Sequence, residues 1–163
     1  MKRMPLMVIM AITIALDQWT KHIARVSLVT AAPRRFGILT LLYAENTGAF
    51  LSLGANLPPQ TRSLIFSGVV AAALAVGLYA LMTNRVGSAA DSIAVAFILG
   101  GGIGNLIDRI FRGGRVTDFL FMAIGPLHTG VFNVADIAIT GGVIFLLLSW
   151  FLTKKSVPSS SAS

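Results

Sequence analysis

The sequence predicts an all-α polytopic membrane protein with four transmembrane helices, a small β-sheet outside the membrane and an interfacial segment. Hydrophobic residues make up 55% of the 163 residues and charged residues only 12%, whereas about a quarter of a soluble domain is charged. Four apolar segments approach or reach the length of about 20 residues that crosses a bilayer. We assign residues 1–155 to a single membrane-embedded domain and expect the polar stretch 156–163 to be a disordered tail.

The first expected span covers residues 5–24. It follows a short basic start and resembles the apolar region of a signal peptide, but no convincing small-residue cleavage site comes after it. Asp17 and Lys21 lie four residues apart, so on a helix they share one face and can form an ion pair. We therefore expect this helix to end in a polar cluster that faces the protein interior.

The next segment is too polar to cross the membrane. Short β-prone runs within residues 34–56 are separated by the turn-like stretch 45–48, and Pro58 and Pro59 then stop regular structure. We expect this segment to form a small sheet against the bilayer surface.

The remaining spans are expected at residues 64–82, 92–109 and 134–152. The third contains Gly100, Gly101, Gly102 and Gly104, although each glycine inside a helix costs about 1 kcal/mol relative to alanine. Such a cluster indicates either close helix packing or close approach of a substrate backbone. The apolar stretch 119–127 is too short to span the membrane, and we interpret it as an interfacial segment or lid. The sequence does not decide whether it forms a helix or an open loop.

The four-span topology brings polar residues from separate stretches to one face of the membrane. The positive-inside rule does not orient the bundle, because five basic residues fall on the side of the tails and six on the other side. The ends of the first and third spans, both long loops and the start of the fourth span nevertheless meet at one side. The residues concerned are Asp17, Asn46, Asp108, Asp118 and Asp136.

Asp118 and Asp136 are the candidate catalytic pair. Carboxylates within or beside membrane segments are costly and usually mark functional sites. Two carboxylates that share a site do not both ionise easily, so one can activate water while the other donates a proton. A Ser or Cys nucleophile and a zinc peptidase are not favoured, because the chain lacks cysteine, a Gly-x-Ser-x-Gly elbow and a His-Glu-x-x-His motif. By elimination, an aspartyl hydrolase fits best.

Structural explanations exist for each acidic residue taken singly. Asp17 with Lys21 could simply close a helix end, and Asp108 with Arg109 could end the third helix at the headgroups. Asp136 is favourable at a helix N-terminus on dipole grounds alone. A proton-coupled transporter subunit and a structural scaffold are the alternative functions, although no internal repeat is visible. Nucleic-acid binding is excluded, because the net charge of +7 does not gather on a soluble basic face.

Five short motifs occur in order over nearly the whole chain, at residues 17–21, 46–50, 101–109, 116–119 and 132–136. They include Gly-Asn-Leu-Ile-Asp-Arg and Phe-Asn-Val-Ala-Asp. Together they resemble the signature motifs of the bacterial lipoprotein signal peptidase family, also called signal peptidase II.

This resemblance implies an inner-membrane aspartyl endopeptidase with four transmembrane helices, cytoplasmic tails and an extracytoplasmic site and sheet. Such enzymes remove the signal peptide from prolipoproteins by cutting before a diacylglyceryl-modified cysteine. They need no metal or cofactor, work among membrane phospholipids, and are inhibited by the cyclic peptide globomycin. By resemblance Asp118 and Asp136 are the catalytic aspartates. The positions implied to support the site or bind substrate are Asp17, Lys21, Asn46, Gly48, Asn105, Asp108, Arg109, Asn133 and Ala135.

Overall fold

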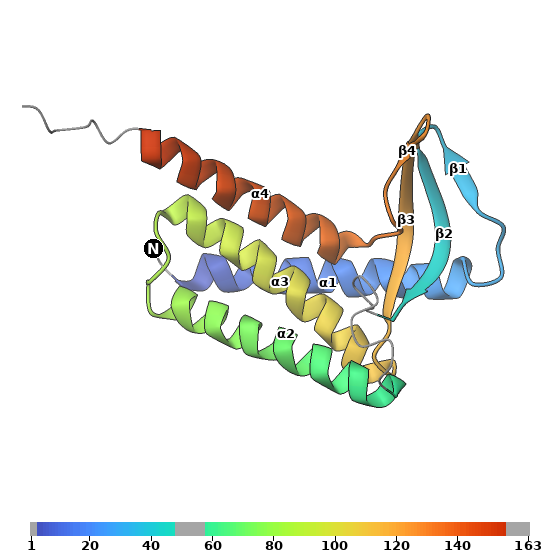
Figure 1. Cartoon of the computed structure of the whole chain (residues 1–163), viewed down its shortest axis with the longest axis horizontal. Coiled ribbons are helices and arrows are strands. Elements are labelled where there is room, and N and C mark those ends of the chain that lie inside the picture. The colour runs from blue at the N-terminus through green and yellow to red at the C-terminus, as the bar shows by residue number, and fades with distance from the viewer. Residues whose placement is uncertain (1–2, 48–57, 156–163) are drawn as a thin grey trace, which may run out of the picture.

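Four helices lie side by side, and an antiparallel sheet stands across one end of them (Figure 1). The structure is a computed structural model that describes residues 3–47 and 58–155. The helices are α1 (Arg3–Ser27), α2 (Pro59–Met82), α3 (Ala89–Phe111) and α4 (Val134–Lys155). The strands are β1 (Arg34–Phe36), β2 (Leu39–Asn46), β3 (Val116–Ile124) and β4 (Leu127–His128).

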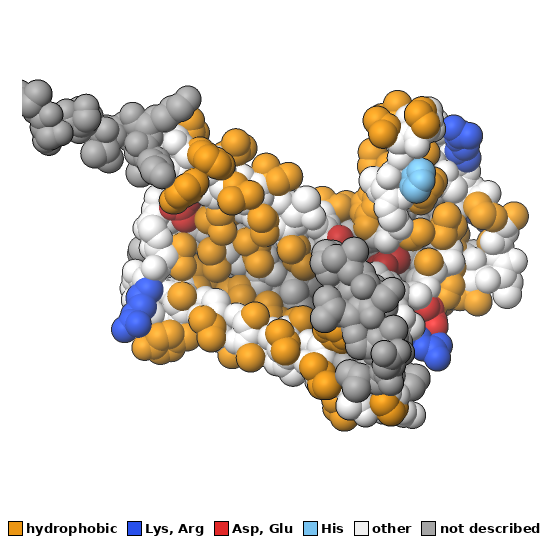
Figure 2. Space-filling view, in the orientation of Figure 1, with side chains coloured by type: hydrophobic (Ala, Val, Ile, Leu, Met, Phe, Trp, Pro, Cys, Tyr) orange, Lys and Arg blue, Asp and Glu red, His pale blue; other side chains and the backbone are white. Residues whose placement is uncertain are grey.

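Three of the helices are long and apolar enough to cross a membrane: Ser63–Met82, Ala89–Phe111 and Val134–Leu152. Helix α1 is equally long, but its second half carries Asp17, Gln18 and Lys21, which lower its mean hydropathy. Large hydrophobic side chains on the helices point outward, such as Ile12 at 53% exposure and Val69 at 63%. In Figure 2 hydrophobic side chains cover the flanks of the helices, and Lys and Arg side chains appear at the two ends. This distribution is typical of a membrane protein.

Helix α3 is the centre of the bundle and packs against the other three helices. Its glycines face different neighbours. A Cβ atom on Gly100 would lie 2.8 Å from the Thr13 side chain of α1, and one on Gly102 would lie 2.5 Å from Leu74 of α2. A Cβ atom on Gly101 would meet the Ala135 carbonyl oxygen of α4 at 2.5 Å. Of the two explanations for the glycine cluster, the structure therefore supports close helix packing.

The sheet has the strand order β1-β2-β3-β4, with every neighbouring pair antiparallel. The stretch 119–127 belongs to β3 and the hairpin that follows it. It is therefore neither the helix nor the open loop that were the two alternatives from the sequence. The expected sheet of residues 34–56 is described only as far as β2, and residues 48–57 lie outside the described part of the chain, as does the tail 156–163. Ala24 and Leu28 at the end of α1 pack against Phe119 of β3, which fixes the sheet on the bundle.

Candidate active site

The two candidate catalytic carboxyl groups come from β3 and from the first turn of α4. Asp118 is 2% exposed and pairs with Ala44 across the strand ladder. Asp136 is the third residue of α4, and the backbone N–H groups of a helix N-terminus favour a negative charge there. The β3–β4 hairpin and the start of α4 thus bring together two acids that are distant in sequence.

Asn133 connects the two carboxyl groups. Its side-chain amide donates a hydrogen bond of 2.6 Å to Asp118 Oδ1, and its backbone N–H donates one of 3.1 Å to Asp136 Oδ2. In return Asn133 Oδ1 accepts from the backbone N–H of Asp136 at 3.0 Å. This reciprocal arrangement is a capping box, and here it also fixes the position of both acids.

Asn105 of α3 holds Asp136 from the other side. Its side-chain amide donates to Asp136 Oδ1 at 2.9 Å, while its Oδ1 accepts from Lys21 Nζ at 2.8 Å and from Asn133 Nδ2 at 3.1 Å. Asp136 therefore accepts hydrogen bonds at both carboxyl oxygens, which fix the orientation of its side chain.

The environment of Asp118 makes this acid easier to protonate than an ordinary aspartate. Burial, together with the negative charge of Asp136, raises the pKa of Asp118 to about 6. Hydrogen bonds from the side chains of Asn133 and Asn46 act in the opposite direction and lower this pKa. The two acids thus sit in different environments, which is the condition for one to hold a proton while the other is ionised.

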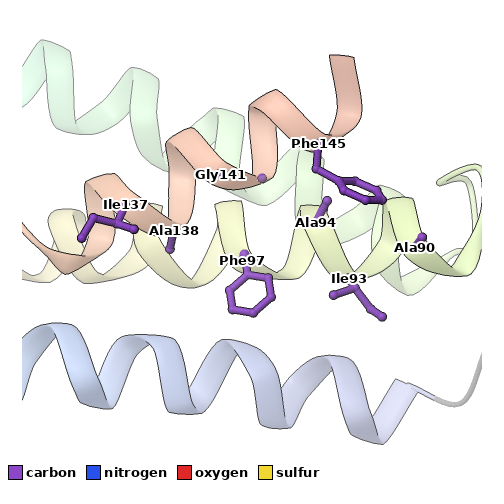
Figure 3. Close-up of a pocket in the computed structure, with 9 residues that line it drawn as sticks. Ala90, Ile93, Ala94, Phe97, Ile137, Ala138, Gly141 and Phe145 are labelled. Atoms are coloured by element: carbon purple, nitrogen blue, oxygen red, sulfur yellow. The ribbon is translucent and has the colours of Figure 1, made fainter. Parts of the chain in front are cut away.

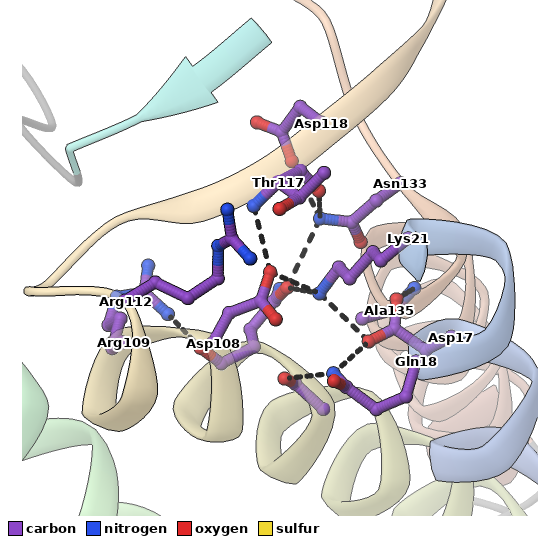
Figure 4. A network of polar contacts seen from close by, with 12 residues as sticks. Asp17, Gln18, Lys21, Asp108, Arg109, Arg112, Thr117, Asp118, Asn133 and Ala135 are labelled. Atoms are coloured by element: carbon purple, nitrogen blue, oxygen red, sulfur yellow. Dashed lines mark hydrogen bonds and ion pairs between the residues drawn. The ribbon is translucent and has the colours of Figure 1, made fainter. Parts of the chain in front are cut away.

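A buried network of charged groups lies beneath the catalytic pair (Figure 4). Lys21 Nζ is 2.8 Å from Asp17 Oδ2 and 3.7 Å from Asp108 Oδ2, and the side chains of Lys21 and Asp17 are 0% exposed. Asp17 Oδ1 also accepts from the backbone N–H of Ala135 at 3.0 Å. Because each buried charge has partners of opposite charge or hydrogen-bond donors, the network ties α1, α3 and α4 together.

Asp108 joins the end of α3 to the start of β3. Its Oδ2 accepts from the backbone N–H of Thr117 at 2.8 Å, and its Oδ1 lies 3.6 Å from Arg25 Nη1. The carbonyl oxygen of Thr117 accepts in turn from Asn133 Nδ2 at 3.3 Å. The residue before Asp118 is thereby held from both sides.

The structure brings together nearly all of the residues that the sequence singled out. Asp17, Lys21, Asn105, Asp108, Asn133 and Ala135 belong to one hydrogen-bonded network around Asp118 and Asp136, and Arg109 interacts electrostatically with both acids. Asn46 reaches Asp118, whereas Gly48 lies outside the described residues.

Three members of this network were not selected from the sequence. Thr117 acts mainly through its backbone groups, which its residue type does not reveal. Gln18 donates to Asp17 Oδ2 at 3.2 Å and to the Gly104 carbonyl oxygen at 3.0 Å. Arg25 pairs with Asp108. A polar residue beside Asp17 in an apolar helix was the available signal for Gln18.

Two pockets lie along α4. One, of about 490 Å³, borders Asp136 and is lined also by Thr129, Phe132 and Thr140. The other, of about 510 Å³, lies between α3 and α4 and is lined by apolar residues such as Phe97 and Phe145 (Figure 3). Only the first offers a reactive group. Among residues 3–47 and 58–155, no group of three or more His, Cys, Asp or Glu side chains could hold a metal ion.

The sequence model of signal peptidase (SPase) II matches residues 9–152, which is most of the chain. The chain belongs to the signal peptidase II family. The resemblance seen in the motifs is thereby confirmed, and membership makes this chain a membrane peptidase.

Known members of the signal peptidase II family are similar over almost their whole length. The lipoprotein signal peptidase of Syntrophus aciditrophicus is 37% identical over 146 residues, which cover 88% of this chain and 90% of that protein. That of Francisella tularensis subsp. mediasiatica is 39% identical over 145 residues, covering 87% and 88%. That of Sphingopyxis alaskensis is 37% identical over 158 residues, covering 93% and 88%.

Two solved structures of bacterial membrane enzymes, both determined by the in meso method, share the fold. One superposes with a TM-score of 0.77 at 21% identity and covers 98% of this chain and 94% of that chain. The other has a TM-score of 0.75 at 24% identity and covers 90% and 92%. The signal peptidase II fold described above is therefore also found in experimental structures.

Proposed function

We propose that this chain is an aspartyl endopeptidase that removes the signal peptide from diacylglyceryl-modified prolipoproteins, cutting before the lipidated cysteine. Family membership and relatives called lipoprotein signal peptidases support the substrate class. The observation that carries the aspartyl mechanism is the pair of hydrogen bonds that Asn133 donates, one to Asp118 and one to Asp136. These bonds hold two acids with different environments beside each other at the end of the bundle.

In the proposed reaction Asp136 is the base and Asp118 the acid. Asp136 takes a proton from a water molecule as the water oxygen forms a bond to the scissile carbonyl carbon. Asp118, whose pKa is raised to about 6, donates a hydrogen bond to the carbonyl oxygen as negative charge develops there. When the C–N bond breaks, the proton taken from water passes from Asp136 to the leaving amine.

The other residues of the motifs support these two acids. Asn105, Asn133 and Asn46 set their positions and protonation, while Asp17, Lys21, Asp108 and Ala135 hold the helices that carry them. Arg109 and Gly48 are proposed to hold the substrate. A globomycin-type cyclic peptide is proposed to compete with substrate at Asp118 and Asp136. The reaction requires no metal or cofactor.

We further propose that α1 is the fourth transmembrane span of an inner-membrane protein with cytoplasmic tails and an extracytoplasmic site. Its polar residues Asp17 and Lys21 are fully buried against α3 and α4, so they are not exposed to lipid. A helix with such an interior-facing cluster can cross a membrane although its average hydropathy is lower.

The test compares Asp118→Asn and Asp136→Asn with the unaltered chain on a diacylglyceryl-modified prolipoprotein. Asparagine keeps the size of the side chain but cannot act as a general acid or base. We expect each variant to lose cleavage by a factor of about 10² or more.

The matched control is Asp91→Asn, which changes an acid at the other end of α3 and is expected to leave cleavage unchanged. Circular dichroism and gel filtration in detergent establish that all variants are folded. Cleavage near the unaltered rate by either catalytic variant would show that the assignment is wrong.

A further inference from the structure

A pocket of about 420 Å³ lies where the first turns of α2 meet the end of α3, and neither acid of the catalytic pair lines it. Its polar lining consists of Gln60, Ser63, Ser67 and Arg109. Gly113 and Gly114 of the following turn complete it. Carboxylates are absent from its lining, so the described part of the pocket offers hydrogen-bond donors and a positive charge.

The hydroxyl groups of Ser63 and Ser67 are available for a ligand. Elsewhere in the helices, Thr13, Thr20 and Thr83 donate their hydroxyl protons to the carbonyl oxygen four residues earlier. Within the described residues, Ser63 and Ser67 make no hydrogen bond, although both are half-buried and one turn apart on the side of α2 that faces α3. Both hydroxyl groups can therefore donate to acceptor atoms of a ligand in the pocket.

The glycine turn covers one end of the pocket. Gly114 has a φ of +84°, and a Cβ atom there would collide with the side chain of Ser63. Only glycine therefore allows this turn to lie directly on α2. The close approach gives the pocket a wall that a larger residue would displace.

Arg109 connects the pocket with the reacting groups. Its side chain lines the pocket, and its charge interacts with those of Asp136 and Asp118. A ligand in the pocket is therefore a neighbour of the catalytic pair. Leu64 at 74% exposure and Ile110 at 62% extend an apolar surface from the pocket along the helices.

We infer that this pocket binds the ester carbonyl groups of a diacylglyceryl lipid, with its acyl chains along the apolar surface of α2. Ester carbonyls accept hydrogen bonds and cannot donate them, which matches a lining of donors, and the acyl chains match Leu64 and Ile110. The inference rests on the proposed function for its first source of this chemistry, the diacylglyceryl group of the substrate. A glycerophospholipid of the bilayer carries the same ester groups and is the second source.

The experiment uses the double variant Ser63→Ala/Ser67→Ala, which removes two hydroxyl groups and keeps both Cβ atoms. Cleavage is measured in ester-free detergent with two synthetic prolipoprotein peptides, one carrying ester-linked and one carrying ether-linked chains on the glyceryl group. We expect the double variant to raise KM for the ester substrate about tenfold, the effect of losing two ordinary hydrogen bonds, and to leave kcat and the ether substrate unchanged. Thr61→Ala, which removes a hydroxyl from the same helix outside the pocket, is the matched control.

A second arm titrates a diacyl phospholipid as a competitor of cleavage. If the KM for the ester substrate is unchanged but the double variant relieves competition by phospholipid, the pocket binds ester carbonyls of bilayer lipid. If neither quantity changes, the inference is wrong even though the enzyme cleaves. If the unaltered chain cleaves neither peptide, the proposed function itself fails.

Discussion

At the scale of single residues, asparagines control the two acids of the site. Asn133 directly precedes α4, whereas Asn105 lies in α3 and Asn46 ends β2. Each of them donates to Asp118 or Asp136. A neutral amide can donate to a carboxylate without adding a charge, so it adjusts the proton affinity of an acid without replacing the ion pair that an arginine would form. The pKa of Asp118 is therefore sensitive to the amides of Asn133 and Asn46.

Substitution of Asn46 by alanine tests this dependence. The hydrogen bond from Asn46 lowers the pKa of Asp118, so its loss should raise that pKa above the value of about 6. If Asp118 must be protonated to act, the decline of kcat/KM at high pH should then move to higher pH. The measurement is a pH profile of prolipoprotein cleavage, whose apparent pKa values belong to the pair of acids together.

The control for this profile is Tyr43→Phe, which removes a hydrogen bond from the same strand to Glu45. It should leave the high-pH decline in place, because the Tyr43 hydroxyl donates to Glu45 and not to Asp118. A shift to lower pH in Asn46→Ala would contradict the assignment of Asp118 as the acid.

The sequence could predict which residues meet, but not every way in which they interact. Asp17, Asp108, Asp118 and Asp136 were expected at one face because four spans bring their segments to the same side. Thr117 was not selected, because it acts through a backbone N–H and a carbonyl group, which every residue possesses.

At the scale of elements, the start of α4 depends on its contact with α3. Gly101 lies against the Ala135 carbonyl oxygen, one residue before Asp136. A backbone atom cannot move aside as the end of a flexible side chain can. The position of Asp136 is therefore determined partly by the absence of a side chain on the neighbouring helix.

Gly101→Ala should displace the start of α4 and destabilise the protein by about 1–3 kcal/mol, the usual effect of an extra methyl group in a packed interior. The matched substitution is Gly68→Ala in α2, where a Cβ atom would meet nothing within 4 Å. That variant should be neutral or more stable by up to about 1 kcal/mol, because alanine favours the helix. Thermal unfolding in detergent, with cleavage measured in parallel, distinguishes the two; equal stability of both variants would contradict the packing argument.

The helices were predictable from sequence and strand β3 was not. Apolar length alone identifies a span, and the described helices overlap the four expected ones. The first residues of β3 are buried on both faces, so the alternation of polar and apolar residues that marks a strand is missing. The residues of its main partner β2 lie 70 to 83 positions earlier than the residues they pair with, and no local pattern encodes such a pairing.

At the scale of the whole molecule, the sheet and the catalytic pair lie at one end of the bundle, opposite the start of α1 (Figure 1). The distribution of basic residues did not determine which end faces outward, because the two sides carry nearly equal numbers of them. The proposed orientation therefore needs a direct measurement.

The absence of cysteine from the sequence makes that measurement simple. Leu127→Cys in the exposed β-hairpin and Ala89→Cys at the start of α3 place single thiols at opposite ends of the bundle. In cells whose outer membrane is permeabilised and whose inner membrane is intact, a membrane-impermeant maleimide should label Leu127→Cys and should not label Ala89→Cys. After the inner membrane is disrupted, both should be labelled. The reverse pattern would show that the site faces the cytoplasm.

The capping box at the start of α4 has a consequence for the biosynthesis of the enzyme. Asp136 lies in the first turn of the last helix, and Asn133 directly precedes that helix. A chain still leaving the ribosome therefore holds Asp118 without its partner or the amide that positions it. We expect the nascent chain to have no peptidase activity until the final helix enters the membrane. The order of synthesis would thus protect neighbouring proteins from premature cleavage, a task for which many soluble proteases carry a removable inhibitory segment.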